Sequence, residues 1–174
     1  MSGAQPSQGQ PSESANSEFV FRRDYRAPRA LVLSAWTDPE QMAEWWGPHG
    51  FTNPVCELDP RPGGRLRIEM HGPDGAVYPM VGVYEAVKSD RVVFTCLPLD
   101  EQGAPLFEIE SAVTFAERAS GGTTQTVRTR LCRVSLGAAI HLVGMEAGFR
   151  QSLERLVDHL AQGGHVGPAA SVRT

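Results

Sequence analysis

Polar and apolar residues alternate along most of residues 54–134, a pattern typical of strands with one buried face. The alternation is clearest at 65–70, where Leu66, Ile68 and Met70 share one face. Turn residues such as those at 72–75 interrupt it and indicate antiparallel hairpins. The pattern predicts about seven strands, at 18–26, 54–59, 65–70, 76–87, 92–96, 106–117 and 123–134.

Residues 138–162 have the period of a helix instead. Large apolar residues recur every three or four positions, and charged residues occupy another face at steps of four. Gly163 and Gly164 then end the helix. The apolar stripe consists of Leu142, Met145, Phe149, Leu153, Leu156 and Leu160.

Two short helices are predicted between the first two strands. Pro28 opens the first helix, whose apolar residues include Val32 and Trp36 at helical spacing. Asp38 is the expected N-cap of the second, because Pro39 suits the first helical position and Gln41 occupies the N3 place of a capping box.

The second helix should stop at two adjacent tryptophans, Trp45 and Trp46, because Gly47 and Pro48 do not continue a helix comfortably. Aromatic residues at a helix end, followed by a glycine- and proline-containing loop, form a plausible rim for an apolar pocket.

These elements predict an α+β fold of the helix-grip type. A long helix with one apolar stripe and a sheet with one apolar face must bury them against each other. The expected architecture is an antiparallel sheet of about seven strands wrapped around the long C-terminal helix, with the two short helices closing one end. The domain should span 18–162, between a disordered tail at 1–17 and a flexible tail at 163–174. After Met1, the first tail has no aromatic residue and no aliphatic residue larger than alanine, and the second, which begins with two glycines and a histidine, looks similar.

Composition excludes several classes of protein. The 174 residues are 41% hydrophobic, which suits one domain with a real core. A net charge of -4 argues against a nucleic-acid partner. No apolar run approaches the roughly 18–20 residues of a membrane span, and the N-terminus lacks the pattern of a signal peptide. Three widely spaced cysteines, at positions 56, 96 and 132, suggest free thiols and a cytoplasmic location.

Several short motifs carry a resemblance to a known family. They are 25–28, 35–39, 45–48 with 50–52, 61–64, 72–75 with 78–79, and 144–149. With these motifs the chain resembles the bacterial family related to the C-terminal domain of the activator of the Hsp90 ATPase, within the START-like (SRPBCC) superfamily. The resemblance implies the helix-grip fold and a hydrophobic cavity, but no chaperone activity, since the eukaryotic activator acts with a separate N-terminal domain.

Large apolar and aromatic side chains are the candidate ligand-binding residues. An alternative is that they simply plug one end of the core, and the pattern does not decide between the two. Because adjacent residues on a helix cannot point the same way, Trp45 or Trp46 should face the cavity mouth or solvent. The candidate set is Trp45, Trp46, Phe51, Met70, Tyr84, Phe94, Met145 and Phe149.

Catalytic and metal-binding patterns are weak by comparison. A cyclase or hydratase would need a carboxylate with a raised pKa, for which Glu85, Glu108, Glu110 and Glu146 are the candidates, but their spacing singles none out. Arg67 and Glu69 would reach the pocket only if the hydrophobic face of their strand were the outer one, and a cross-strand surface ion pair is expected instead. The five histidines lack metal-ligand spacing, and a Cys132–His141 nucleophilic pair has no third orienting group in view.

The sequence therefore predicts no catalytic residue, cofactor or metal. It favours a domain that binds an apolar, amphipathic or lipid-like small molecule between its sheet and its C-terminal helix without chemistry. Two alternatives stay open: a cyclase, hydratase or hydrolase that uses the same cavity, and a module that binds Hsp90 or another protein partner. The oligomeric state, the pathway and the ligand's identity do not follow from the sequence.

Overall fold

A computed structural model describes residues 17–163. Seven strands and four helices lie within this range. Apart from Ser17 and Gly163, the two predicted tails fall outside the described residues. The elements are β1 (Glu18–Tyr25), α1 (Arg29–Thr37), α2 (Pro39–Trp45), β2 (Thr52–Leu58), β3 (Arg65–His71), β4 (Val77–Lys88), β5 (Arg91–Pro98), β6 (Phe107–Glu117), β7 (Thr123–Val134), α3 (Ala139–Leu142) and α4 (Met145–Ala161).

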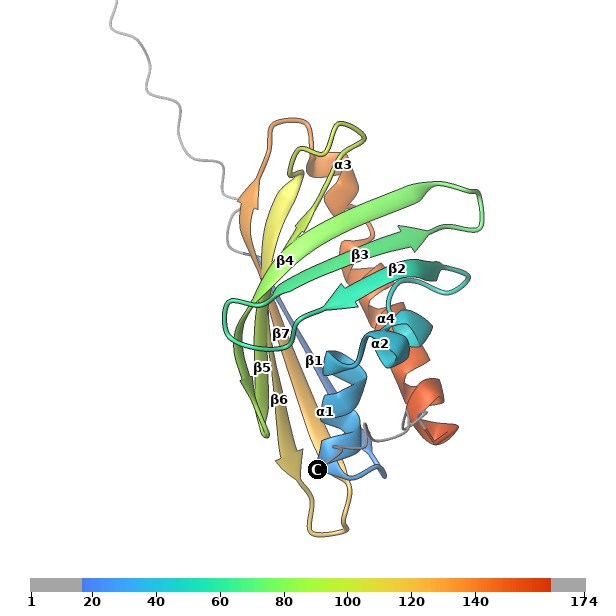
Figure 1. The fold of residues 1–174 in the computed structure, drawn as a ribbon, viewed down its shortest axis with the longest axis vertical. Helices are drawn as coiled ribbons and strands as arrows, with labels where there is room; N and C mark the ends of the chain where they lie inside the picture. Colours follow the sequence, from blue (N-terminus) through green and yellow to red (C-terminus); the bar gives the residue numbers. More distant parts are fainter. Residues whose placement is uncertain (1–16, 164–174) are drawn as a thin grey trace, which may run out of the picture.

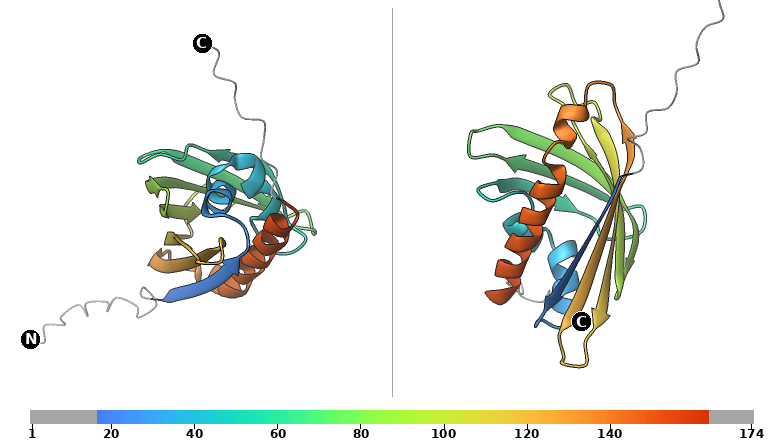
Figure 2. Two further views of the ribbon diagram at one scale, coloured as in Figure 1. Left: turned by 90° about the horizontal axis from the view of Figure 1, so that it is seen from below. Right: turned by 180° about the vertical axis from the view of Figure 1, so that it is seen from behind.

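The sheet confirms the predicted antiparallel fold. Its strand order is β1-β7-β6-β5-β4-β3-β2, so the chain's first strand pairs with its last and β2 forms the opposite edge. Each strand from β2 to β6 pairs with the strand that follows it along the chain. The sheet curves, and α4 lies along the same side as α1 and α2 (Figure 1; Figure 2). This is the α+β helix-grip architecture that the alternation and the C-terminal stripe predict.

Strand β2 begins two residues earlier than predicted. It includes Pro54, which lacks a backbone N–H and is normally excluded from the middle of a sheet. The strand tolerates this proline because it is an edge strand and because its register shifts between Thr52 and Val55.

The corner between α1 and α2 is formed by one residue, Asp38. Its backbone N–H donates to the Ser34 carbonyl and closes α1, while its carboxylate accepts hydrogen bonds from the backbone of Glu40 and Gln41 at 2.9 and 3.3 Å. The predicted N-cap is therefore confirmed. The reciprocal half of the capping box is not made, because the Gln41 side chain donates to Ser34 Oγ and also contacts His159.

The C-terminal helix is broken, contrary to the single helix predicted at 138–162. The short helix α3 ends at Leu142, and α4 begins at Met145 after Gly144, whose φ of 84° lies in the left-handed region. This glycine, inside an apolar periodicity, is the physical reason for the break. The consequence is that Val143 is 81% exposed beside the start of α4.

The core lies between the sheet and the helices α1, α2 and α4. Trp36 and Trp45 are fully buried, with ring centroids 4.7 Å apart in an edge-to-face arrangement. Leu153 and Leu156 from α4 are fully buried as well. The aromatic core fills the end of the domain near α1 and α2. The open space therefore lies near the N-terminal half of α4.

Candidate ligand-binding cavity

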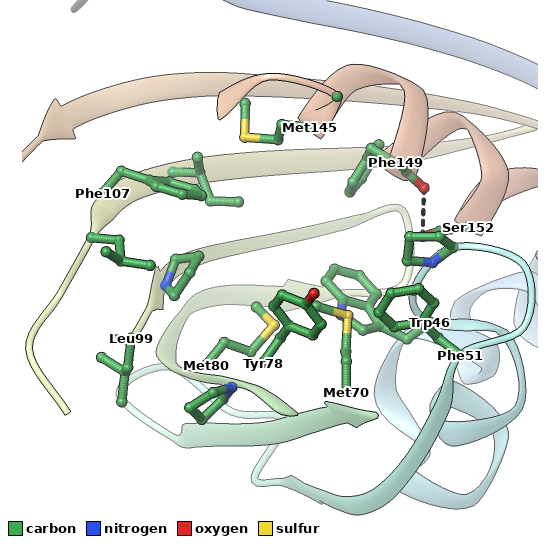
Figure 3. Close-up of a pocket in the computed structure, with 18 of the residues that line it drawn as sticks. Trp46, Phe51, Met70, Tyr78, Met80, Leu99, Phe107, Met145, Phe149 and Ser152 are labelled. Atoms are coloured by element: carbon green, nitrogen blue, oxygen red, sulfur yellow. Dashed lines mark hydrogen bonds between the residues drawn. The ribbon is translucent and has the colours of Figure 1, made fainter. Parts of the chain in front are cut away.

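A cavity of about 330 Å³ lies between the sheet and the N-terminal half of α4. Figure 3 shows side chains from α4 on one wall and from the strands on the facing wall. None of the described residues that line it carries a charged side chain. The lining consists of Trp46, Gly47, Pro48, Phe51, Met70, Tyr78, Pro79, Met80, Pro98, Leu99, Leu106, Phe107, Ile109, Val143, Gly144, Met145, Gly148, Phe149 and Ser152.

Glycines allow the loop after α2 to approach the cavity closely. Gly47 has a φ of 91°, and a Cβ there would lie 3.1 Å from Met70 Sδ and 3.3 Å from Phe51 Cβ. Gly148 on α4 faces the same loop, since a Cβ there would meet Pro48 Cγ at 3.4 Å. A larger residue at Gly47 would be strained and would push the loop away from the cavity wall.

Arg155 of α4 fixes this loop from behind. Its Nη1 donates to the carbonyl oxygens of Trp46, Gly47 and Pro48 at 2.9 to 3.1 Å, and its Nη2 donates to the Glu44 carbonyl at 2.8 Å. These are carbonyls at and just after the C-terminus of α2, where a cation is favoured by the helix dipole. Burial lowers the pKa of Arg155, against the opposing effect of the nearby Glu44 carboxylate.

Two further contacts join the loop to α4. The His49 backbone N–H donates to Gln151 Oε1 at 3.1 Å, and its Nε2 lies 2.9 Å from Glu154 Oε2. Residues 46–49 are thus held by three polar residues of α4 that do not line the cavity, Gln151, Glu154 and Arg155. The wall formed by Trp46, Gly47 and Pro48 is therefore fixed by contacts within the protein.

The polar groups of the cavity are two hydroxyls on facing walls. Ser152 is 4% exposed and lies on α4, and its Oγ donates to the Gly148 carbonyl at 3.1 Å. Tyr78 belongs to β4, and its ring packs at a tilted angle beside Phe51, with ring centroids 5.7 Å apart. Its hydroxyl points into the cavity (Figure 3). Such a lining solvates an apolar body and offers hydrogen bonds to an uncharged polar group.

Five of the eight candidate residues line the cavity. They come from the loop after α2, from β3 and from α4, and they are Trp46, Phe51, Met70, Met145 and Phe149. Trp46 is only 5% exposed, so it faces the cavity without reaching solvent. Its ring makes an edge-to-face contact with Phe149, with centroids 6.0 Å apart.

Trp45, Tyr84 and Phe94 lie in the core and not on the cavity wall. Trp45 Nε1 donates to the Ala35 carbonyl at 2.9 Å, and the Tyr84 hydroxyl donates to the Trp36 carbonyl at 3.2 Å. Burial raises the pKa of Tyr84, in keeping with a phenol used as a structural donor. Phe94 packs between Trp36, Trp46 and Tyr84. The Tyr84 hydroxyl is therefore not offered to a ligand.

Sequence reasoning missed most of the wall contributed by the sheet. Tyr78 and Met80 share a face of β4 with Tyr84, so the period of two places all three inward. The period does not say which part of that face α1 and α2 cover. Ser152 was also missed, although a hydroxyl one turn after Phe149 in an otherwise apolar stripe is a signal that the sequence contains.

The candidate catalytic carboxylates are bound to partners outside the cavity lining. Glu110 pairs with Arg130 at 3.2 Å, Glu108 with Arg133 at 3.8 Å and Glu146 with Arg150 at 3.1 Å. Glu85 accepts a hydrogen bond from Thr95 Oγ1 at 2.6 Å. Arg67 contacts Glu69 on its own strand and Glu57 on the neighbouring strand β2. The contact with Glu57 is the expected cross-strand surface ion pair.

Metal and thiol sites are equally unsupported among residues 17–163. No cluster of three or more His, Cys, Asp or Glu side chains there could hold a metal ion. Cys56, Cys96 and Cys132 are all free thiols. The pairing of Cys132 with His141 depends on a histidine side chain that lies outside the described part.

Among the helices of residues 17–163, none has the length and apolar character that crossing a membrane requires.

A family model described as "Activator of Hsp90 ATPase homolog 1-like protein" matches residues 26–161. The fold is also similar to several solved bacterial proteins. One from Rhizobium leguminosarum superposes with a TM-score of 0.73 at 23% identity, covering 84% of this chain and 95% of that one. One from Silicibacter pomeroyi gives 0.72 at 22%, covering 84% and 99%.

A protein from Mycobacterium smegmatis gives a TM-score of 0.69 at 25% identity, with 86% of this chain and 91% of that one covered. A comparison of the sequence with curated proteins found no match. These structural likenesses show the same arrangement of strands and helices.

Proposed function

We propose that this chain, which belongs to the family of Activator of Hsp90 ATPase homolog 1-like proteins, binds an uncharged and largely apolar small molecule between its sheet and α4, without chemistry. The family itself is compatible with a ligand-binding domain. The observation that carries the proposal is the cavity lining, in which 19 residues contribute no charged side chain.

The volume and the lining together narrow the ligand. About 330 Å³ is near the lower end of the roughly 300–1,000 Å³ typical of small-molecule sites. A charged group would lose its hydration without gaining a partner, since burying an unpaired charge is costly. A compact molecule with aromatic or branched apolar parts suits the walls, where Met70, Met80 and Met145 can adapt to its shape.

The lining residues carry no carboxylate, imidazole, amine or thiol, and this composition favours binding rather than catalysis. General acid–base chemistry needs a titratable group within hydrogen-bond reach of the substrate. The hydroxyls of the lining belong to Tyr78 and Ser152, and no lining histidine or carboxylate stands beside them as a base. We propose a reducing compartment such as the cytoplasm, in keeping with the free cysteines.

The test uses N-phenyl-1-naphthylamine, an uncharged fluorescent probe, with three forms of the protein. Met145→Trp places a larger side chain at the cavity, so the affinity should fall at least tenfold, about 1.4 kcal/mol. Val157→Trp is the matched control, because Val157 lies on the same helix, is 38% exposed and is not part of the lining. Its affinity should equal that of the wild type.

Near-ultraviolet circular dichroism checks that both variants keep their fold. If folded Met145→Trp binds the probe as well as Val157→Trp does, the probe sits elsewhere and the cavity is not its site. If the wild type binds no uncharged probe at all, the ligand-binding proposal should be given up.

A second candidate, a protein-partner module, rests on a different observation. Leu136, Ile140 and Val143 are 107%, 74% and 81% exposed within ten residues of chain around α3. Large exposed apolar side chains close together are typical of interaction sites. Replacing Leu136 and Ile140, which do not line the cavity, with serine should abolish binding to an Hsp90-type partner in a pull-down if this candidate is correct, while leaving binding of the naphthylamine probe intact.

A further inference from the structure

Ser152 breaks the apolar face that α4 presents to the cavity. The neighbours of Ser152 one turn away are Phe149 on one side and Leu156 on the other. The side chain of Ser152 is 96% buried, since its exposed fraction is 4%, and it belongs to the lining. A hydroxyl at such a position gives up hydration that an alanine would never have needed.

The hydrogen-bonding state of Ser152 decides what it can offer. Its one proton is directed to the Gly148 carbonyl at 3.1 Å. No donor among residues 17–163 contacts Ser152 Oγ, so its remaining lone-pair capacity is unused. A serine bonded in this way to its own helix is an acceptor toward the cavity.

The surroundings restrict the complementary group. The cavity holds no charged side chain that could balance an ammonium or a carboxylate. Figure 3 shows Ser152 near Trp46 and Phe51, with Leu99 and Phe107 at the other end. A ligand that satisfies the serine therefore carries its hydroxyl or N–H at the Trp46 end and apolar groups at the Leu99 end.

We propose that Ser152 selects ligands that bear a neutral hydrogen-bond donor, a hydroxyl or an N–H, on an otherwise apolar body. This inference rests on the proposed function and names the ligand class of the same cavity. Tyr78 also lines the cavity, but it is 43% exposed, so water can satisfy its hydroxyl and it places no such demand on the ligand.

Three probes of one shape separate the donor from the rest of the molecule: naphthalene, 2-naphthol and 2-methoxynaphthalene. Only 2-naphthol can donate a hydrogen bond. Isothermal titration gives the affinity of each for the wild type, for Ser152→Ala and for Tyr78→Phe. The loss caused by each substitution is compared between probes, so that differences in the probes' own hydration cancel.

Ser152→Ala should weaken 2-naphthol about five- to tenfold, in line with the loss of one net hydrogen bond, and leave the other two probes within about twofold. Tyr78→Phe, the matched removal of the other cavity hydroxyl, should not produce this selective loss. Alanine favours a helix, so Ser152→Ala should fold.

Two outcomes overturn the inference in distinguishable ways. If all three probes bind the wild type and Ser152→Ala affects them equally, the serine does not select a donor, but the cavity remains a binding site. If none of the probes binds the wild type, the inference fails together with the proposed function.

Discussion

Replacing Arg155 with methionine should destabilise the protein far more than an ordinary surface arginine substitution. Methionine keeps an apolar stem of similar length but removes four hydrogen bonds of 2.8 to 3.1 Å to the carbonyls of residues 44 and 46–48. Hydrogen bonds from a charged donor contribute about 1.5–3 kcal/mol each when buried. The guanidinium is only half-buried, and Trp46 O keeps its bond from Asn53 Nδ2. We therefore expect a total loss of about 2–3 kcal/mol.

Urea unfolding followed by tryptophan emission measures this loss, because Trp45 and Trp46 stand at the clamped end of α2. The control is Arg150→Met, on an exposed face of the same helix, where an i,i+4 pair with Glu146 contributes about 0.3–0.5 kcal/mol. The m-value should stay constant for both. If the two variants differ by less than about 1 kcal/mol, the clamp does not stabilise the loop, and the argument from carbonyl satisfaction is wrong.

Two further predictions concern stability. Asp38→Ala should cost about 1 kcal/mol by removing the N-cap bonds to Glu40 and Gln41, and thermal denaturation should show a much smaller effect for Asp158→Ala on the polar face of α4; equal losses would contradict the capping role. Burial raises the pKa of Cys56 to about 12, so the unfolded chain releases this proton at lower pH than the folded one, and stability should fall as pH rises from about 9 toward 12. Cys56→Ala should lose less of its urea midpoint between pH 7.5 and pH 10 than the wild type does, and identical losses would exclude Cys56 as a cause.

The sequence was sufficient for the arrangement of strands and helices because local signals and burial agreed. The alternation at 65–70 reappears as the buried Leu66 and Ile68 of β3, and Asp38 caps α2 as its neighbours indicated. The helix break at Gly144 was missed because one glycine in a helical period is a weak signal. The apolar stripe continues across the break, so only the backbone conformation reveals it.

The cavity residues were harder to predict because inward-facing does not mean ligand-facing. Met70 and Tyr84 both lie on inner faces, but α1 and the tryptophans cover Tyr84 and leave Met70 open. That difference depends on which helices pack over each part of the sheet, and a period of two carries no such information. The role of Arg155 was missed for a related reason. Its partners are backbone carbonyl oxygens, which every residue has, so the sequence gives no sign of them.

The Arg155 clamp has a consequence for how the molecule is made. Its hydrogen bonds join positions separated by 107 to 111 residues. Among the described residues no other group donates to the Gly47 carbonyl, whereas the Pro48 carbonyl also accepts from the Phe51 backbone N–H. During synthesis from the N-terminus, α1, α2 and all seven strands emerge before Arg155 does. The loop at 46–48, which forms one wall of the cavity, therefore lacks the hydrogen bonds from Arg155 until α4 has left the ribosome and packed against the sheet. The cavity is therefore completed last, and the proposed ligand site exists only once the chain is nearly whole.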